Sequence, residues 1–139
     1  MAINIFTIEA RSLNILGFGS HDFWVLKGPN GAVIAELGGY AFNRISQTID
    51  PIGYTSDHSL RVFQSVHNPS YANEIGSSTT GAKFYYSPGQ SSVLAFAGTQ
   101  EQVFAKWNAA TNSVYFLNDL DLDYPIGGVN VFSPTINSN

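Results

Sequence analysis

Three side chains in this sequence are of types that could carry acid–base or nucleophilic chemistry: His21, Glu36 and Ser138. His21 follows the glycine-containing residues 17–20 and opens an apolar run. Its imidazole is therefore expected at the open end of a strand, where a general base could reach a substrate. The alternative for a single histidine is a partly exposed, hydrogen-bonding residue at a strand end.

The position of Glu36 follows from a predicted β-hairpin. Residues 22–26 and 32–37 are apolar runs that flank a turn containing Asn30-Gly31, and such a dipeptide supplies the positive φ angles of a tight turn. With this turn, Trp24 pairs with Leu37 and Glu36 lies opposite Val25. Glu36 could then orient or charge-balance the His21 imidazole if strand twist brings the two closer. Otherwise it is a solvent-facing strand carboxylate.

Ser138 lies in the polar C-terminal stretch of residues 136–139. A serine becomes a nucleophile only when a base adjoins it, so its role depends on where His21 lies. His58 follows Asp57 and could form half of a metal site, but no companion ligands are spaced to complete it. We therefore predict no metal and no cofactor.

An acidic segment at residues 119–123 alternates aspartate with leucine. On a strand its three carboxylates would share one face and could ligate Ca²⁺ through oxygen. The favoured interpretation is a solvated acidic face with Leu120 and Leu122 turned inward.

The elements that must position these groups are mostly strands. Besides the hairpin, alternating or β-branched patterns predict strands at residues 3–8, 60–66, 83–86 and 92–97. Polar, glycine- and proline-containing residues predict loops at 38–58 and 67–81 and an irregular tail at 124–139.

One principal helix is predicted at about residues 100–112. Thr99 and Gln102 form a capping box, and Val103, Phe104, Trp107 and Ala110 then share one face. The sequence thus predicts a single α+β domain over residues 1–139, an antiparallel sheet with this helix.

Composition excludes several classes of function. Charged residues make up 12% of the chain, about half the usual ~25%. The net charge is −4 and the six Lys and Arg residues are scattered, so nucleic-acid binding is not expected. No apolar run is long enough to predict a membrane span. The chain has no cysteine, which excludes disulfides, thiolate metal sites and a cysteine nucleophile, and its low charge leans towards a secreted bacterial protein.

A family resemblance rests on the hairpin. Residues 19–26, the Asn-Gly turn and residues 33–37 resemble the histidine-bearing hairpin of permuted papain-like bacterial domains, the NlpC/P60-related and lecithin:retinol-acyltransferase-like group. Residues 105–110 and 137–139 resemble the later part of such domains. The resemblance implies a papain-like permuted arrangement, with His21 as base, a polar orienting residue near Glu36 and a nucleophile at or just after Ser138. It also implies hydrolysis or transfer of a peptide, amide or acyl substrate, in an active, truncated or inactive form.

Two other classes of function stay open. The low charge and 14% aromatic content also suit a non-catalytic β-rich structural module that self-assembles as a homo-oligomer or binds a protein partner. A ligand or glycan binder would use Trp24, Trp107 and tyrosines as stacking faces, although both tryptophans also fit core positions.

Overall fold

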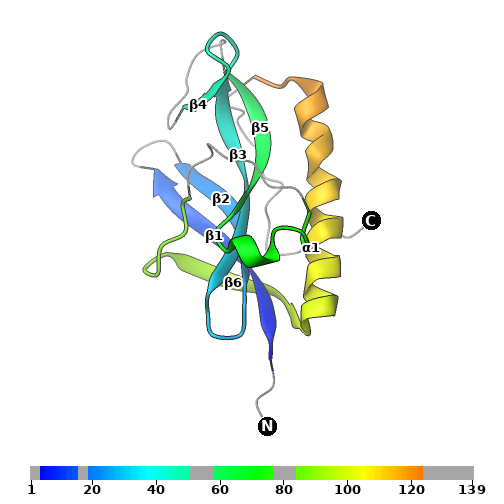
Figure 1. Ribbon diagram of the computed structural model, residues 1–139. Helices are drawn as coiled ribbons and strands as arrows, with labels where there is room; N and C mark the ends of the chain where they lie inside the picture. The colour runs from blue at the N-terminus through cyan, green and yellow to red at the C-terminus, as the bar shows by residue number, and fades with distance from the viewer. Residues whose placement is uncertain (1–3, 16–18, 51–57, 77–83, 124–139) are drawn as a thin grey trace.

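The fold is an antiparallel sheet of six strands with one main helix, which confirms the predicted α+β class (Figure 1). The computed structural model describes residues 4–15, 19–50, 58–76 and 84–123. The strands are β1 (Phe6–Ile15), β2 (Gly19–Lys27), β3 (Val33–Asn43), β4 (Thr48–Asp50), β5 (His58–Val66) and β6 (Ser91–Gly98). The helices are α1 (Gln100–Tyr115) and the short 3₁₀ segments η1 (Pro69–Tyr71) and η2 (Phe116–Leu120).

Every strand pairing in the described part of the chain is antiparallel. The path runs β5, β3, β2, β1, β6, and the short β4 pairs with the last residues of β3. The hairpin between β2 and β3 has the predicted pairs, with Trp24 opposite Leu37 and Val25 opposite Glu36, but its register shifts by one residue between Leu26 and Lys27. Because side chains alternate along a strand, these two pairs point to opposite faces of the sheet.

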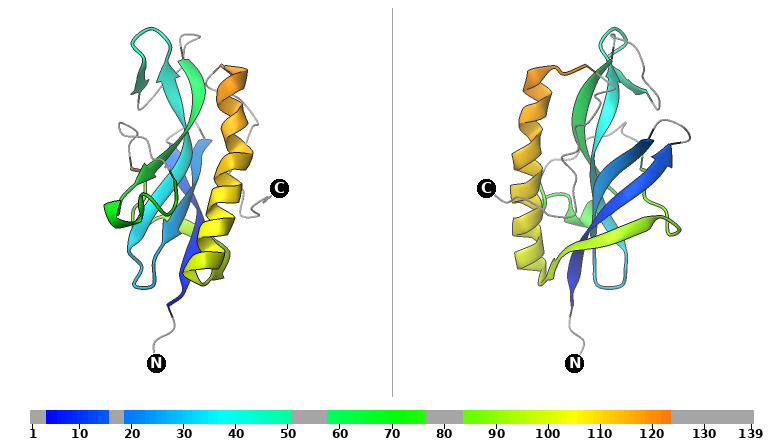
Figure 2. Two further views of the ribbon diagram at one scale, coloured as in Figure 1. Left: turned by 45° about the vertical axis from the view of Figure 1, so that its right-hand side comes forward. Right: turned by 180° about the vertical axis from the view of Figure 1, so that it is seen from behind.

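The first of these faces packs against α1, and we call it the helix face (Figure 2). The helix buries the four apolar residues predicted from its periodicity, Val103, Phe104, Trp107 and Ala110. Trp24 and Leu37 lie in the same cluster. The second face carries Glu36 and His21, and it is the face on which the candidate site is built.

The helix begins where the capping box predicts. The Thr99 hydroxyl accepts a hydrogen bond from the Gln102 amide at 3.2 Å, and the Gln102 side chain accepts one from the Thr99 amide at 3.0 Å. These two bonds satisfy amide groups that the first helical turn leaves free. The helix runs to Tyr115, past the predicted end near residue 112.

Three local predictions are wrong. Strand β3 continues through Gly38 and Gly39 to Asn43, and β4 follows, where a loop was expected. Residues 84–86 are not a strand, because the Tyr85 and Tyr86 amides donate their hydrogen bonds to the Glu36 carboxylate instead of to a neighbouring strand. Leu120, expected inward, is 53% exposed, since the chain turns at Asp121 in a left-handed conformation with φ of 48°. No helix in the described residues is both long and apolar enough to cross a membrane.

Candidate functional site

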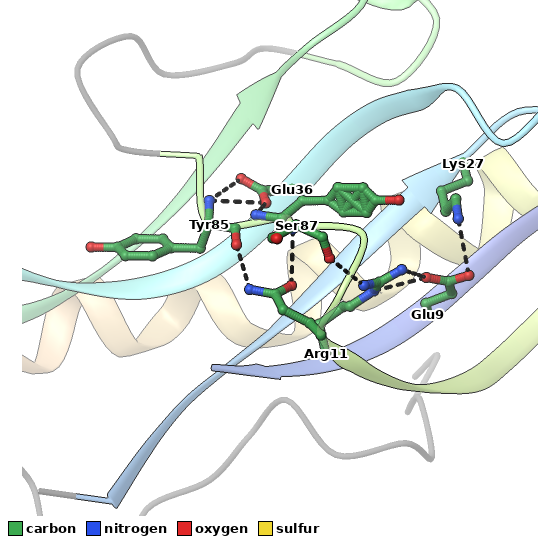
Figure 3. Close-up of polar contacts among 8 residues, drawn as sticks. Glu9, Arg11, Lys27, Glu36, Tyr85 and Ser87 are labelled. Atoms are coloured by element: carbon green, nitrogen blue, oxygen red, sulfur yellow. Dashed lines mark hydrogen bonds and ion pairs between the residues drawn. The ribbon is translucent and has the colours of Figure 1, made fainter. Parts of the chain in front are cut away.

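A buried carboxylate forms the centre of the second face. Glu36 is 0% exposed, and its two oxygens accept hydrogen bonds from the Tyr85 amide at 3.1 and 3.0 Å (Figure 3). The Tyr86 amide also donates to this carboxylate. Residues 84–87, which we call the strap, are thereby fixed against the sheet, and we call the second face the strap face.

A second set of polar contacts holds the far end of the strap. The Arg11 guanidinium donates to the Ser87 carbonyl at 2.9 Å, and the Gln90 side chain donates to the Tyr85 carbonyl at 2.6 Å. The Arg11 guanidinium also lies 4.4 Å from the centre of the Tyr86 ring. Glu9 balances this charge, since its carboxylate accepts bonds from Arg11 at 2.9 and 2.7 Å.

His67 adds a basic group beside Glu36. Its Nε2 lies 3.3 Å from one Glu36 oxygen, and its ring contacts Phe84 of the strap with centroids 3.5 Å apart. A protonated His67 would place a positive charge against the buried carboxylate. His67 was not among the predicted site residues, because only its place just past the end of β5, which pairs with β3 beside Glu36, brings it here.

His21 lies on the same face inside an aromatic cluster, so its Nε2 atom is buried and does not open outward at the strand end as predicted. Its ring centroid is 4.3 Å from that of Tyr85, 5.2 Å from that of Phe23 and 5.7 Å from that of Tyr40. Its Nε2 atom is buried and has no hydrogen-bond partner in the part of the chain that the structure describes. A buried nitrogen without a partner is uncommon in native proteins, so this atom requires an explanation.

The environment of His21 keeps its imidazole neutral at pH 7. Burial lowers the pKa of His21 to about 4, and the negative charges of Glu36 and Asp22 oppose this shift. Burial likewise raises the pKa of the Tyr40 hydroxyl, and the Glu36 charge adds to that rise. Glu36 therefore acts on both neighbours through its charge.

Gly38 supplies the room for the His21 ring. A Cβ atom at this position would lie 3.5 Å from His21 Cε1 and Nε2 and 3.3 Å from Phe23 Cβ. The last distance is tighter than ordinary carbon contacts. The glycine that suggested a loop instead marks a close approach of the His21 ring and the Phe23 Cβ atom to the β3 backbone.

The structure thus brings two of the three predicted site residues to one face. Glu36 is sealed, so the solvent-facing alternative is wrong, and its hydrogen bonds go to the strap rather than to His21. Ser138 lies outside the described residues. Trp24 and Trp107 are 1% and 0% exposed and offer no stacking surface to a ligand.

The described residues do not form either of the two metal sites considered from the sequence, one at His58 and one at residues 119–123. His58 is buried on β5, and Asp57 lies outside the described residues. Within the four described stretches of chain, no three His, Asp or Glu side chains are grouped closely enough to hold a metal ion. Asp121 and Asp123 instead pair with Arg44 at 3.2 and 2.9 Å.

The lowered pKa of His21 predicts a pH-dependent stability. The folded chain takes up this proton only near pH 4, whereas the unfolded chain does so near 6.5. The unfolded state therefore binds more protons between these values, and stability falls as the pH drops through that window, by at most about 3 kcal/mol. Urea unfolding at about pH 7.5 and pH 4.5 measures this loss.

His21→Phe is the matched variant for that measurement. It keeps an aromatic ring but removes the titrating group, so it is expected to lose less stability than the parent chain between the two pH values. Contributions from groups that do not interact with His21 are the same in both proteins and cancel in the difference. An identical pH dependence in the two proteins would show that His21 titrates normally.

Comparisons with protein-family models, with curated proteins and with solved structures gave no match for this chain. The function must therefore be inferred from the geometry of the strap face.

Proposed function

We propose that this chain is a papain-like hydrolase- or acyltransferase-type domain in which His21 is the general base. The single observation that carries the proposal is the Nε2 atom of His21, which is buried and has no hydrogen-bond partner among the described residues. Leaving such an atom without a partner costs about 1–3 kcal/mol. Perturbed groups of this kind gather at sites where chemistry is done.

Glu36 has an electrostatic role in this proposal. A base that takes up a proton in a desolvated site creates a cation that burial disfavours. The negative charge of Glu36 raises the pKa of His21 and so offsets part of that cost. The Tyr85 and Tyr86 amides hold this carboxylate in one position.

The proposed reaction is acyl transfer through Ser138. The serine oxygen bonds to the carbonyl carbon of a peptide, amide or ester substrate, and its proton passes to Nε2 of His21. The protonated imidazole then gives this proton to the leaving amine or alcohol as the acyl bond breaks. Water or a second acceptor completes the cycle by attack on the acyl-serine.

A fluorophosphonate probe tests the pairing of base and nucleophile without a known substrate. The parent chain is expected to gain one covalent phosphonyl group at Ser138, seen by intact mass and peptide mapping. His21→Gln should slow this labelling by about 10²–10⁴-fold, the usual contribution of a general base. Labelling should also slow as the pH falls towards 4, where His21 becomes protonated.

Two further variants complete the design. Ser138→Ala should abolish the label, whereas Ser92→Ala, at an exposed serine of β6, should leave the rate unchanged. Circular dichroism establishes that each variant is folded. An unlabelled parent chain, or equal rates in the parent chain and folded His21→Gln, would overturn the proposal.

A further inference from the structure

The two outer strands of the sheet, β5 and β6, differ in whether other residues cover the backbone groups of their free edges. The β5 edge is covered: the Asn118 side chain accepts from the Val62 amide at 2.6 Å and donates to the Val62 carbonyl at 3.1 Å. The Leu60 amide donates to the Leu122 carbonyl at 2.8 Å. These contacts from η2 and the residues after it satisfy backbone groups that would otherwise invite another strand.

The β6 edge has no such cover among the described residues. Strand β6 pairs with β1 on one side, and no described residue pairs with its other side (Figure 2). Val93 and Leu94 on this strand are 52% and 61% exposed. Native edge strands are usually blunted by charge, proline or a covering element, and β6 contains neither a charged residue nor a proline.

We infer that β6 pairs antiparallel with β6 of a second copy of this chain, which joins the two sheets into one. The absence of charge along this edge favours this occupant. Residues 84–98 contain no charged side chain, in a chain whose net charge is −4. Two copies therefore repel over most of their surface but meet without a charge penalty at this edge.

The neighbours of the strand are consistent with a neutral interface. Leu94 lies opposite Glu9 on β1, and the Glu9 carboxylate is already paired with Arg11 at 2.7 Å and Lys27 at 3.4 Å. No uncompensated carboxylate of β1 thus faces the incoming strand. A strongly charged peptide would find no partner charge on β6 itself.

Symmetry restricts the register of this pairing. A two-fold axis perpendicular to the sheet keeps each side chain on its own face, and residues opposite one another in an antiparallel pair share a face. The two-fold axis must therefore lie between one residue and its own symmetry copy, and not between two consecutive residues of the strand. Among the registers that this symmetry allows, we infer the one that places Val93 or Leu94 opposite its own counterpart, because it buries the exposed apolar surface of β6.

Size-exclusion chromatography with light scattering tests the association. The parent chain is expected to approach twice its mass of 15.1 kDa as concentration rises. Leu94→Lys and Val93→Lys should each return it to 15.1 kDa. In either variant the two introduced lysines would lie close to each other on opposite sides of the two-fold axis, and like charges there destabilise the pairing. Ile45→Lys is the matched control, since Ile45 is 77% exposed away from β6 and should leave the dimer intact.

Single cysteines test the register, and the chain offers a background without cysteine. Opposed Cα atoms in an antiparallel pair lie about 4.5–5.5 Å apart, within disulfide range. Val93→Cys or Leu94→Cys, whichever lies on the axis, should form a crosslinked dimer on mild oxidation, and Ile45→Cys should not. A parent chain of 15.1 kDa at every concentration, a dimer that both lysine variants leave intact, or a dimer that neither cysteine crosslinks would overturn the inference.

Discussion

Glu36→Ala is expected to destabilise the fold by about 3–5 kcal/mol, the usual cost of removing one partner from a buried charged network. The substitution leaves the Tyr85 and Tyr86 amides without their acceptor in a place where the carboxylate is 0% exposed. It also removes the negative charge beside His67. Urea unfolding at neutral pH measures the loss, and the strap is expected to exchange its amide hydrogens faster.

Two other carboxylate variants control this prediction. Glu36→Gln keeps the shape and one good acceptor oxygen, so its loss should fall between those of the parent chain and Glu36→Ala. Asp121→Asn removes a carboxylate that is 68% exposed and paired with Arg44, so its effect should stay within about 1 kcal/mol. Equal losses for Glu36→Ala and Asp121→Asn would mean that the strap is not held by Glu36.

The same substitutions separate the site from the sheet edge. The strap leads through residues 88–90 into β6, so loosening it at Glu36 could also disturb the edge. The reverse dependence is not expected, since Leu94 is 61% exposed on β6 and lies opposite Glu9 of β1. Leu94→Lys should therefore abolish pairing of copies while leaving fluorophosphonate labelling unchanged, and the two proposals can fail independently.

Local sequence signals predicted the elements that depend on neighbours in the chain. The pairing of Trp24 with Leu37 is the one predicted from the Asn-Gly turn, although a register shift between Leu26 and Lys27 shows that a β-bulge beside the turn also sets it. The capping box fixed the start of α1 in the same way. Both signals act over a few residues, so no tertiary information was needed.

The candidate site depended on contacts that no local pattern reveals. The hydrogen bonds of Glu36 reach amides 49 and 50 residues away, and a backbone amide carries no mark in the sequence. A charged residue within the apolar run of residues 33–37 was the one available sign that Glu36 is paired and buried. Gly38 led to a wrong prediction of a loop, since close side-chain packing against a strand and a loop both favour glycine.

Trp107→Ala is expected to cost about 3–5 kcal/mol, the range for deleting a large buried aromatic side chain. Trp107 is 0% exposed at the centre of the helix face, and its indole Nε1 donates a hydrogen bond to the Gln64 side chain of β5. Trp107→Phe separates the two contributions: it keeps much of the apolar contact but removes the hydrogen bond that Trp107 donates to the Gln64 side chain. The loss of this buried hydrogen bond should account for about 1–3 kcal/mol of the total.

A double-mutant cycle with Gln64→Leu tests whether the hydrogen bond matters beyond packing. Gln64 is 1% exposed, so leucine fills a similar buried volume without a polar group. Gln64→Leu alone orphans the indole N–H, and with Trp107→Phe it leaves neither polar group behind. The double variant is thus expected to be more stable than the sum of the single losses implies, by about 1 kcal/mol or more in urea unfolding. Strict additivity would mean that α1 is held to β5 by apolar contact alone.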